Sequence, residues 1–245
     1  MRRLLPGTGD VDDAGLVEAY RLPAGRSLRV NFVVSLDGAV TVGGRSEALG
    51  SPADRRVFEL LRALSDGVLV GHGTAAAEGY RPIIADSRVG RLRSSLGRPA
   101  TAPVVVVSRR ASLDPGSRLV GGAVSPTLLV TCAAADADRR SALADAGVQV
   151  LVCGDDDVDL PLALDRLAER GLEQVLCEGG PQLLRAALRA GVVDELALTV
   201  SPTLVGAAGT RLLGEELADR IPLELRQVLQ EDGFLLTRYG VRAAR

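Results

Sequence analysis

Short apolar runs alternate with longer amphipathic segments along most of the chain. The apolar runs are rich in Val and Leu, which is typical of strands buried on both faces of a sheet. They predict strands at residues 27–36, 67–71, 103–108, 127–131, 148–152 and 173–178. The amphipathic segments predict helices after Ser51 and at roughly 136–146, 160–170 and 181–190.

The clearest helix begins at Pro52, a residue that suits the first helical position. Ser51 can cap it, and Asp54 completes an S-x-x-D capping box. The apolar positions that follow share one helical face and are Val57, Leu60, Leu61 and Leu64.

The last part of the chain has a different pattern. "DELALTVSP", "LELRQVLQ" and "GFLLTRYG" read as strands with no helix between them. The pattern therefore predicts an α/β fold whose mixed sheet is flanked by helices and finishes with antiparallel strands. We expect residues 1–26 to be an N-terminal extension with a short helix near "DAGLVEAY", and 27–245 to be a single domain. The segment "HGTAAAEGYRP" is expected to be a turn.

Composition narrows the class of protein. The chain has 245 residues, 47% of them hydrophobic, and a net charge of −2, so nothing in its bulk charge favours nucleic acid or an anionic membrane. All 29 basic residues are Arg, and a single His excludes a site with several His ligands to a metal. The three Cys are never spaced as CxxC, which favours buried thiols in a reducing compartment. No signal peptide or membrane span is evident, so the expected location is the cytoplasm.

Gly179 and Gly180 stand between a predicted strand and a helix beginning at Pro181. Glycine lets a phosphate approach the free N–H groups of a helix N-terminus, so a diphosphate cofactor is one interpretation. A tight turn that needs glycine for its own geometry is the other, and the spacing favours neither.

A second glycine motif, Gly71-x-Gly73-x-x-Ala76, formally matches a dinucleotide fingerprint. The fingerprint also needs a helix and then a strand ending in an acid, whereas this chain is interrupted at Gly79 and Pro82. A Rossmann unit is therefore not expected, although these glycines can still line a cofactor.

Three charged or titratable residues have two interpretations each. His72 is either a general base or, more in keeping with its surroundings, a packed loop residue. Asp37 is either catalytic or the start of an Asx turn with Gly38. Arg62 lies near the edge of a helical apolar face, where exposure to solvent is favoured over contact with a substrate phosphate.

The segments "VNFVVSLDG", a G-x-S before the helix ending in "LLRA", "DGVLVGHGT", "EGGPQLL" and "VDELALTVSP" follow one another in this order. With them the chain resembles the pyrimidine reductase family of riboflavin biosynthesis, over roughly residues 27–240. The resemblance implies a dihydrofolate-reductase-like fold, NADPH as cofactor and a homodimer. It also implies hydride transfer to ribose C1′ of 5-amino-6-(5-phosphoribosylamino)uracil, which becomes the ribitylamino compound.

The resemblance further implies site residues by matched position. The expected cofactor contacts are Val33, Ala48, Thr74, Glu78, Ser108, Gly179, Gly180, Pro181, Gln182, Leu183 and on to Ala186. The expected substrate contacts are Ser46, Arg62, Pro82 and Glu178, with Arg62 preferred for the phosphate because guanidinium forms paired hydrogen bonds with it. Candidates for catalytic roles are Glu178, Asp37 and Glu78. Arg109, followed by Arg110, is expected to neutralise the 2′-phosphate of NADPH.

The chain departs from the family pattern in two places within the site. Glu78 stands where many members carry the Asp of an Asp-Pro pair, and Ala48 replaces a common aromatic residue. The zinc signature of the deaminase domain often fused to this reductase is absent. These departures keep two alternatives open: a reductase of a pterin or dihydrofolate-like substrate, and a nucleotide-binding paralogue without catalysis.

Overall fold

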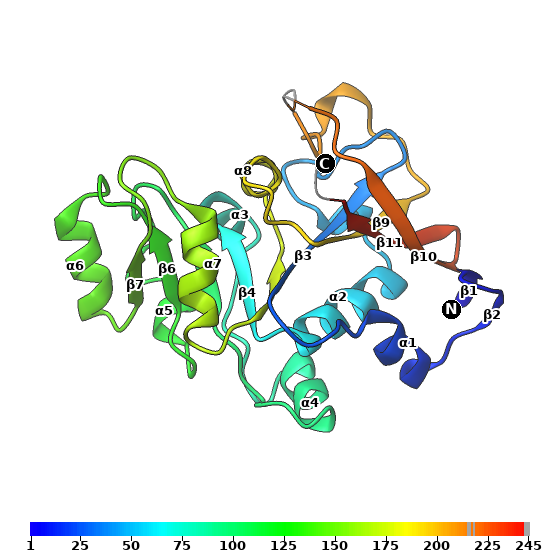
Figure 1. Ribbon diagram of the computed structural model, residues 1–245, viewed down its shortest axis with the longest axis horizontal. Helices are drawn as coiled ribbons and strands as arrows, with labels where there is room; N and C mark the ends of the chain where they lie inside the picture. Colours follow the sequence, from blue (N-terminus) through cyan, green and yellow to red (C-terminus); the bar gives the residue numbers. More distant parts are fainter. Residues whose placement is uncertain (215–216, 218, 243–245) are drawn as a thin grey trace.

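The computed structural model describes residues 1–242 except 215, 216 and 218. Eleven strands in this part of the chain form one sheet in the order β2-β1-β10-β11-β9-β3-β8-β4-β5-β6-β7 (Figure 1). The strands are β1 (Arg2–Leu5), β2 (Gly9–Asp10), β3 (Ser27–Ser35), β4 (Gly67–Gly71), β5 (Val104–Val107), β6 (Leu128–Thr131), β7 (Gln149–Val152), β8 (Gln174–Cys177), β9 (Glu195–Ser201), β10 (Leu223–Glu231) and β11 (Phe234–Val241).

Helices connect most of the strands in the first two thirds of the chain. They are α1 (Asp13–Tyr20), α2 (Pro52–Leu64), α3 (His72–Ala77), α4 (Arg88–Ser95), α5 (Arg118–Gly121), α6 (Ala137–Asp145), α7 (Leu160–Ala168) and α8 (Pro181–Arg189). Single 3-10 turns lie at Glu47–Leu49 and Gly206–Ala208. No helix of the described residues is long and apolar enough to cross a membrane.

The sheet has a parallel part and an antiparallel part. β3 pairs in parallel with both β8 and β9, and β4 to β7 continue the parallel order away from β8. β11 then pairs antiparallel with β9, and β10 with β11. The predicted mixed sheet with an antiparallel finish is confirmed.

Apolar side chains fill both faces of the sheet. On one face, α7 and α8 pack against β3, β8 and the strands beyond them. On the other face, α1 and α2 cover β8, β9, β10 and β11, and α3, α5 and α6 cover β4, β5 and β6. Cys132, Cys153 and Cys177 are buried free thiols, as predicted.

The N-terminal residues are more closely joined to the sheet than the sequence suggested. β1 pairs with β10, and the predicted helix at "DAGLVEAY" is α1. Tyr20 at its end is 1% exposed, and its ring packs beneath the guanidinium groups of Arg29 and Arg238. Because Arg238 also donates a hydrogen bond to the carbonyl of Ala19, the extension is tied to β11.

The strands and the four expected helices occur where the patterns placed them, within a few residues. Ser51 caps α2 by accepting a hydrogen bond from Asp54 N–H at 3.1 Å. The expected turn at "HGTAAAEGYRP" is wrong in its first half, where six residues form α3. Ala75 of α3 packs into the core beside β4 and β5, and the run of three Ala that ends the helix combines small size with high helix propensity. α4 and α5 were not predicted.

Candidate active site

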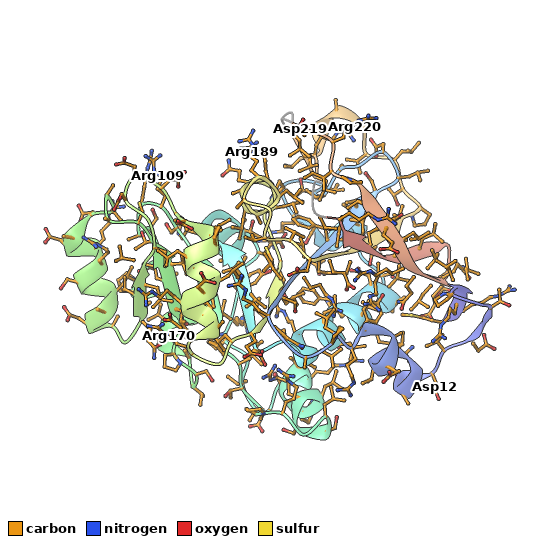
Figure 2. All side chains as sticks on the ribbon, in the orientation of Figure 1. Asp12, Arg109, Arg170, Arg189, Asp219 and Arg220 are labelled. Carbon is orange, nitrogen blue, oxygen red and sulfur yellow. The ribbon has the colours of Figure 1, made fainter. Side chains whose placement is uncertain are left out.

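The predicted site residues gather at the edge of the sheet where the parallel strands end. β8 leads into Glu178, β4 into His72, β5 into Ser108 and β3 toward Asp37. Open α/β sheets bind their ligands at this carboxyl edge. Figure 2 shows Arg109 at this edge and Arg170 at the opposite one.

Two glycine turns meet at the centre of the edge. Gly71 N–H donates to the carbonyl of Gly179 at 2.7 Å. A Cβ at Gly180 would collide with Oγ1 of Thr74, and Gly179 has φ +82° with the ring of Phe32 where its Cβ would be. The peptide bond between the two glycines is cis. The glycine motifs that the sequence offered as competitors therefore form one surface.

The helix that follows these glycines has an open N-terminus. Gly180 is its N-cap and supplies no side-chain hydrogen bond, whereas α1, α2, α4, α6 and α7 are each capped by an Asp or Ser side chain. The first-turn N–H groups of α8, at Gln182 and Leu183, carry the positive end of the helix dipole. This arrangement fits an anionic ligand such as a diphosphate.

Beside the glycines, Glu178 is held by two other side chains. Arg62 Nε donates to its Oε1 and Arg62 Nη2 to its Oε2, each at 2.6 Å, and Tyr80 Oη donates to Oε2 at 2.5 Å. The Arg62 guanidinium lies between the rings of Phe58 and Tyr80, 4.3 and 5.2 Å from their centroids. The interpretation of Arg62 as a solvent-exposed residue is therefore wrong, because its guanidinium forms paired hydrogen bonds with Glu178.

The electrostatics of this cluster follow from burial and charge. Burial acts to lower the pKa of Arg62, but the Glu178 carboxylate outweighs it and holds that pKa above its usual value. Burial, reinforced by the negative charge of Glu178, raises the pKa of Tyr80 well above its usual value. Arg62 is thus a cation and Tyr80 a protonated phenol, and both donate to the carboxylate of Glu178.

Glu78 connects two loops of the site. Its Oε1 accepts a hydrogen bond at 2.9 Å from the backbone N–H of Ser46, so the C-terminus of α3 is tied to the 36–51 loop. Ser46 is half-buried and Ala48, in the following 3-10 turn, is exposed. The longer side chain at position 78 thus serves as an anchor for the loop that carries two predicted ligand contacts.

Asp37 forms no Asx turn with Gly38. Its carboxylate accepts hydrogen bonds from Ser35 Oγ at 2.6 Å and from the N–H groups of Val205 and Gly206 at 3.0 and 2.8 Å. These donors, the Ser35 hydroxyl first, lower the pKa of Asp37 below its usual value. Asp37 therefore anchors the segment after β9 to the end of β3.

Ser108 and Arg109 lie on the other side of α8. Ser108 Oγ accepts from Ser112 N–H at 3.0 Å, and exposed Arg109 donates from Nε to the carbonyl of Asp156 at 2.9 Å. A hollow of about 440 Å³ lies between the segment at 154–161, with Asp155, Asp157 and Asp159 among its lining residues, and Ala186 and Ala190 at the end of α8. Arg109 is therefore bonded to the segment that forms one wall of this hollow.

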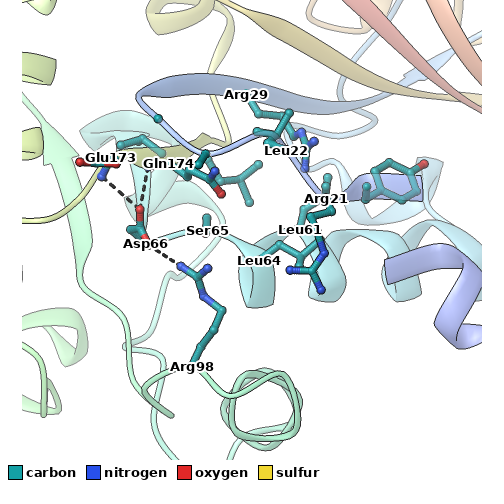
Figure 3. A pocket seen from close by; sticks show the side chains of 15 residues that line it. Arg21, Leu22, Arg29, Leu61, Leu64, Ser65, Asp66, Arg98, Glu173 and Gln174 are labelled. Carbon is teal, nitrogen blue, oxygen red and sulfur yellow. Dashed lines mark hydrogen bonds and ion pairs between the residues drawn. The ribbon is translucent and has the colours of Figure 1, made fainter. Parts of the chain in front are cut away.

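The remaining predicted residues are less central. Val33 is half-buried in β3, and His72 is partly exposed at the start of α3. Pro82 lies next to Gly122, at the end of α5. Another cavity, of about 350 Å³, lies at the amino edge of the sheet among Tyr20, Arg98 and Gln174 (Figure 3). The Asp66–Arg98 ion pair lies at this cavity on the amino edge, whereas Glu178 lies at the carboxyl edge.

Sequence reasoning missed Phe58 and Tyr80. One signal was available for Phe58: it precedes Arg62 by four positions on a helix, where side chains stack on one face. Tyr80 has no comparable signal, because its approach to Glu178 bridges 98 residues of sequence.

Comparisons with known proteins show which family the chain resembles. Residues 26–233 match the family model described as the RibD C-terminal domain. A 2,5-diamino-6-ribosylamino-4(3H)-pyrimidinone 5′-phosphate reductase of Methanothermobacter thermautotrophicus is 35% identical over 220 residues, covering 87% of this chain and 97% of the relative. The Aquifex aeolicus protein of that name is 28% identical over 218 residues, with 85% and 93% covered.

The fold is also shared with solved structures. A pyrimidine reductase-like protein from Corynebacterium diphtheriae superposes with a TM-score of 0.79 at 28% identity, covering 89% of this chain and 93% of that one. The family model spans well over half of the chain, and the relatives align over nearly their full length. This chain therefore belongs to the RibD C-terminal domain family.

Proposed function

We propose that this protein is an NADPH-dependent reductase of a pyrimidine ribosylamine 5′-phosphate. The observation that carries the proposal is the Glu178–Gly180 turn, which places a held carboxylate next to an uncapped helix N-terminus. The names of the relatives support a pyrimidinone phosphate as substrate. Those names give the diamino-pyrimidinone, whereas the sequence resemblance implied the uracil, so both belong in the test.

The residues at the carboxyl edge fit a nicotinamide dinucleotide. Added Cβ atoms would fill the cradle at Gly179 and Gly180, and the open first turn of α8 suits a diphosphate. Thr74 flanks this cradle, and Arg109 donates to the carbonyl of Asp156, whose neighbours Asp155 and Asp157 line the hollow beside α8. When bound, the cofactor supplies a hydride to C1′ of the opened ribose.

The part of the protein's own residues in this chemistry is to hold and orient the substrate. The Glu178 carboxylate accepts hydrogen bonds from Arg62 and Tyr80, and such an acceptor suits an N–H or hydroxyl of the substrate near the reacting carbon. The Ser46–Glu78 bond fixes the loop that carries Ser46 and Ala48. Preorganised hydrogen-bonding groups of this kind lower the cost of reaching the transition state.

One observation favours a second candidate, a reductase of a dihydrofolate-like substrate. Arg62, the expected phosphate ligand, directs Nε and Nη2 to Glu178. A folate needs no ligand for a ribose phosphate, so an Arg62 committed to Glu178 is compatible with it. This candidate is the necessary control for the proposal.

The test is NADPH oxidation by the purified protein, followed by the loss of absorbance. The diamino-pyrimidinone and uracil ribosylamine phosphates are compared with dihydrofolate under the same conditions. We expect turnover of a ribosylamine phosphate with little on dihydrofolate. Turnover on dihydrofolate alone, or bound NADPH with no turnover on any of the three, would refute the proposal.

Replacement of Arg109 tests the cofactor preference. A guanidinium contact with phosphate contributes roughly 1.5–3 kcal/mol, so Arg109→Ala is expected to raise the Kd for NADPH by roughly 10- to 100-fold. The Kd for NADH should stay within about two-fold, since NADH has no 2′-phosphate. Fluorescence titration of both cofactors measures this, with Arg21→Ala at the opposite edge as control. Equal losses for NADPH and NADH would show that Arg109 does not bind the 2′-phosphate.

We also propose a homodimer in the cytoplasm. β1, β10 and β11 expose Leu5, Leu225 and Leu235, which are 37%, 43% and 37% accessible, on the antiparallel part of the sheet. Apolar side chains exposed on neighbouring strands favour association with a second copy. Three buried free thiols favour a reducing compartment. A monomeric mass in sedimentation experiments would contradict the dimer.

A further inference from the structure

The hydrogen bonds to Glu178 leave one of its oxygens more open than the other. An ionised carboxylate has about four acceptor positions, two on each oxygen. Arg62 Nη2 and Tyr80 Oη both donate to Oε2, whereas Arg62 Nε is the one donor to Oε1 among the described residues. Oε2 is therefore saturated, and Oε1 keeps a position for a ligand donor.

The surroundings of Tyr80 hold its hydroxyl in contact with Glu178. Its backbone N–H donates to the carbonyl of Ala75 at 2.9 Å, and Gly79 before it has φ +65°, a conformation that glycine adopts readily. Its ring packs on the Arg62 guanidinium from one side while Phe58 packs from the other. With its pKa raised by burial and by Glu178, the phenol stays protonated and donates at every pH used in an assay.

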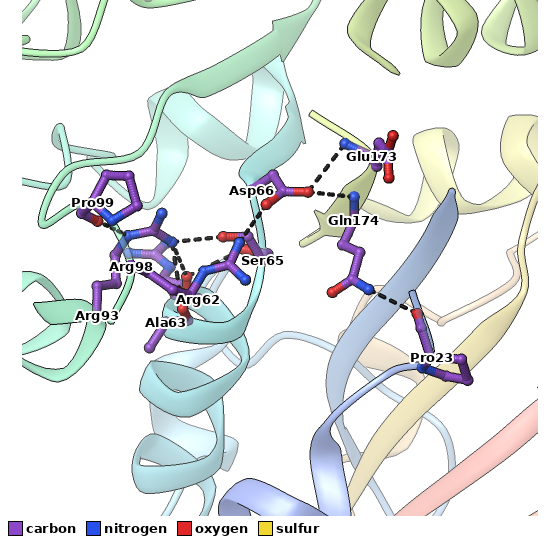
Figure 4. A network of polar contacts seen from close by, with 10 residues as sticks. All are labelled: Pro23, Arg62, Ala63, Ser65, Asp66, Arg93, Arg98, Pro99, Glu173 and Gln174. Atoms are coloured by element: carbon purple, nitrogen blue, oxygen red, sulfur yellow. Dashed lines mark hydrogen bonds and ion pairs between the residues drawn. The ribbon is translucent and has the colours of Figure 1, made fainter. Parts of the chain in front are cut away.

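The other donor, Arg62, is fixed through its own backbone. The buried guanidinium of Arg93 in α4 donates to the carbonyls of Arg62 at 3.1 Å and Ser65 at 2.6 Å, and also to that of Pro99 (Figure 4). These bonds satisfy carbonyls at the C-terminus of α2, which lack partners within the helix. The last turn of α2, and with it the base of the Arg62 side chain, is thus clamped against α4.

We propose that Tyr80 is a positioning residue of the active site, which closes Oε2 of Glu178 and so leaves Oε1 as the atom that accepts from the substrate. This inference rests on the proposed function and adds to it the residue that selects one carboxylate oxygen. Without the phenol hydroxyl, Oε2 gains a free acceptor position, so substrate or water can bind in a second, unproductive orientation.

The test is Tyr80→Phe, which keeps the ring and removes the hydroxyl, with Tyr239→Phe on β11 as matched control. We expect kcat to fall by about ten-fold, the loss of one hydrogen bond to a charged group, and the Kd for NADPH to stay within about two-fold. The NMR chemical shift of the Glu178 carboxyl carbon, measured in labelled protein at a single pH, should differ from that of wild type, because Oε2 loses a hydrogen-bond donor.

The two measurements separate this inference from the proposed function. A variant with unchanged kcat and an unchanged Glu178 chemical shift would overturn the role of Tyr80. A less stable variant with an unchanged Glu178 chemical shift would also overturn it, because the hydroxyl would then be purely structural. If the wild type turns over no ribosylamine phosphate, the proposed function fails, and the chemical shift by itself still decides whether Tyr80 contacts Glu178.

Discussion

Glu178→Ala is expected to remove reductase activity and to lower the free energy of unfolding by about 3–5 kcal/mol. The Glu178 side chain is 2% exposed and that of Arg62 is 18% exposed. Removal of the carboxylate leaves a buried guanidinium with no counter-charge, which costs more than the ion pair itself contributes. Urea unfolding measures the change in stability and NADPH oxidation the change in activity.

A double variant separates the two effects. Arg62→Met with Glu178→Leu removes both charges but leaves the Tyr80 hydroxyl without its acceptor, so part of the lost stability should return while activity stays absent. Glu169→Ala, in the exposed Arg166–Glu169 pair, is the control and should cost less than about 1 kcal/mol. If the free energy of unfolding of Glu178→Ala lies within about 1 kcal/mol of the wild-type value, Arg62 and Glu178 do not form a buried ion pair whose members depend on each other.

Gly180→Val is expected to abolish NADPH binding in a protein that still folds. Its Cβ would collide with Oγ1 of Thr74, and the added methyl groups would occupy the approach to the first turn of α8. Relief of the collision moves α8 away from α3 and breaks the cradle, because the interior is close-packed. Calorimetric titration with NADPH measures the loss, and circular dichroism reports the fold.

The control for this variant is Gly121→Val in α5, where a Cβ would meet no atom within 4 Å. That variant should bind NADPH as the wild type does. Gly180→Val with unchanged NADPH affinity would show that the phosphate region of the cofactor lies elsewhere.

Much of the fold could be predicted because its strands are buried on both faces and therefore appear as continuous apolar runs. The helix after Ser51 was equally clear, since cap, proline and apolar face agree. α3 was hidden because its residues are small and a glycine interrupts the motif, so its burial depends on β4 and β5 rather than on local periodicity. Pairing of β1 with β10 joins the two ends of the chain, and no local pattern encodes it.

The site was predictable in its positions and less so in its contacts. Glycines between a strand and a helix mark Gly179 and Gly180 from the sequence, and the family resemblance placed Glu178 and Arg62 in one site. Their mutual hydrogen bonds depend on α2 crossing the end of β8, which only the tertiary structure shows. Asp37 was a candidate for catalysis from its loop motif and Glu78 from its matched position in the family pattern. The structure shows that each carboxylate ties two segments together, which the sequence does not reveal.

The most direct test of the proposed function is the fate of hydride in a single reaction. NADPH deuterated at the transferred position is incubated with the protein and the diamino-pyrimidinone ribosylamine 5′-phosphate, and the product is examined by mass spectrometry and NMR. We predict a ribitylamino product that carries one deuterium at C1′. A product without deuterium, or recovery of the unreduced substrate from a protein that binds NADPH, would contradict the assignment of this site as a pyrimidine reductase.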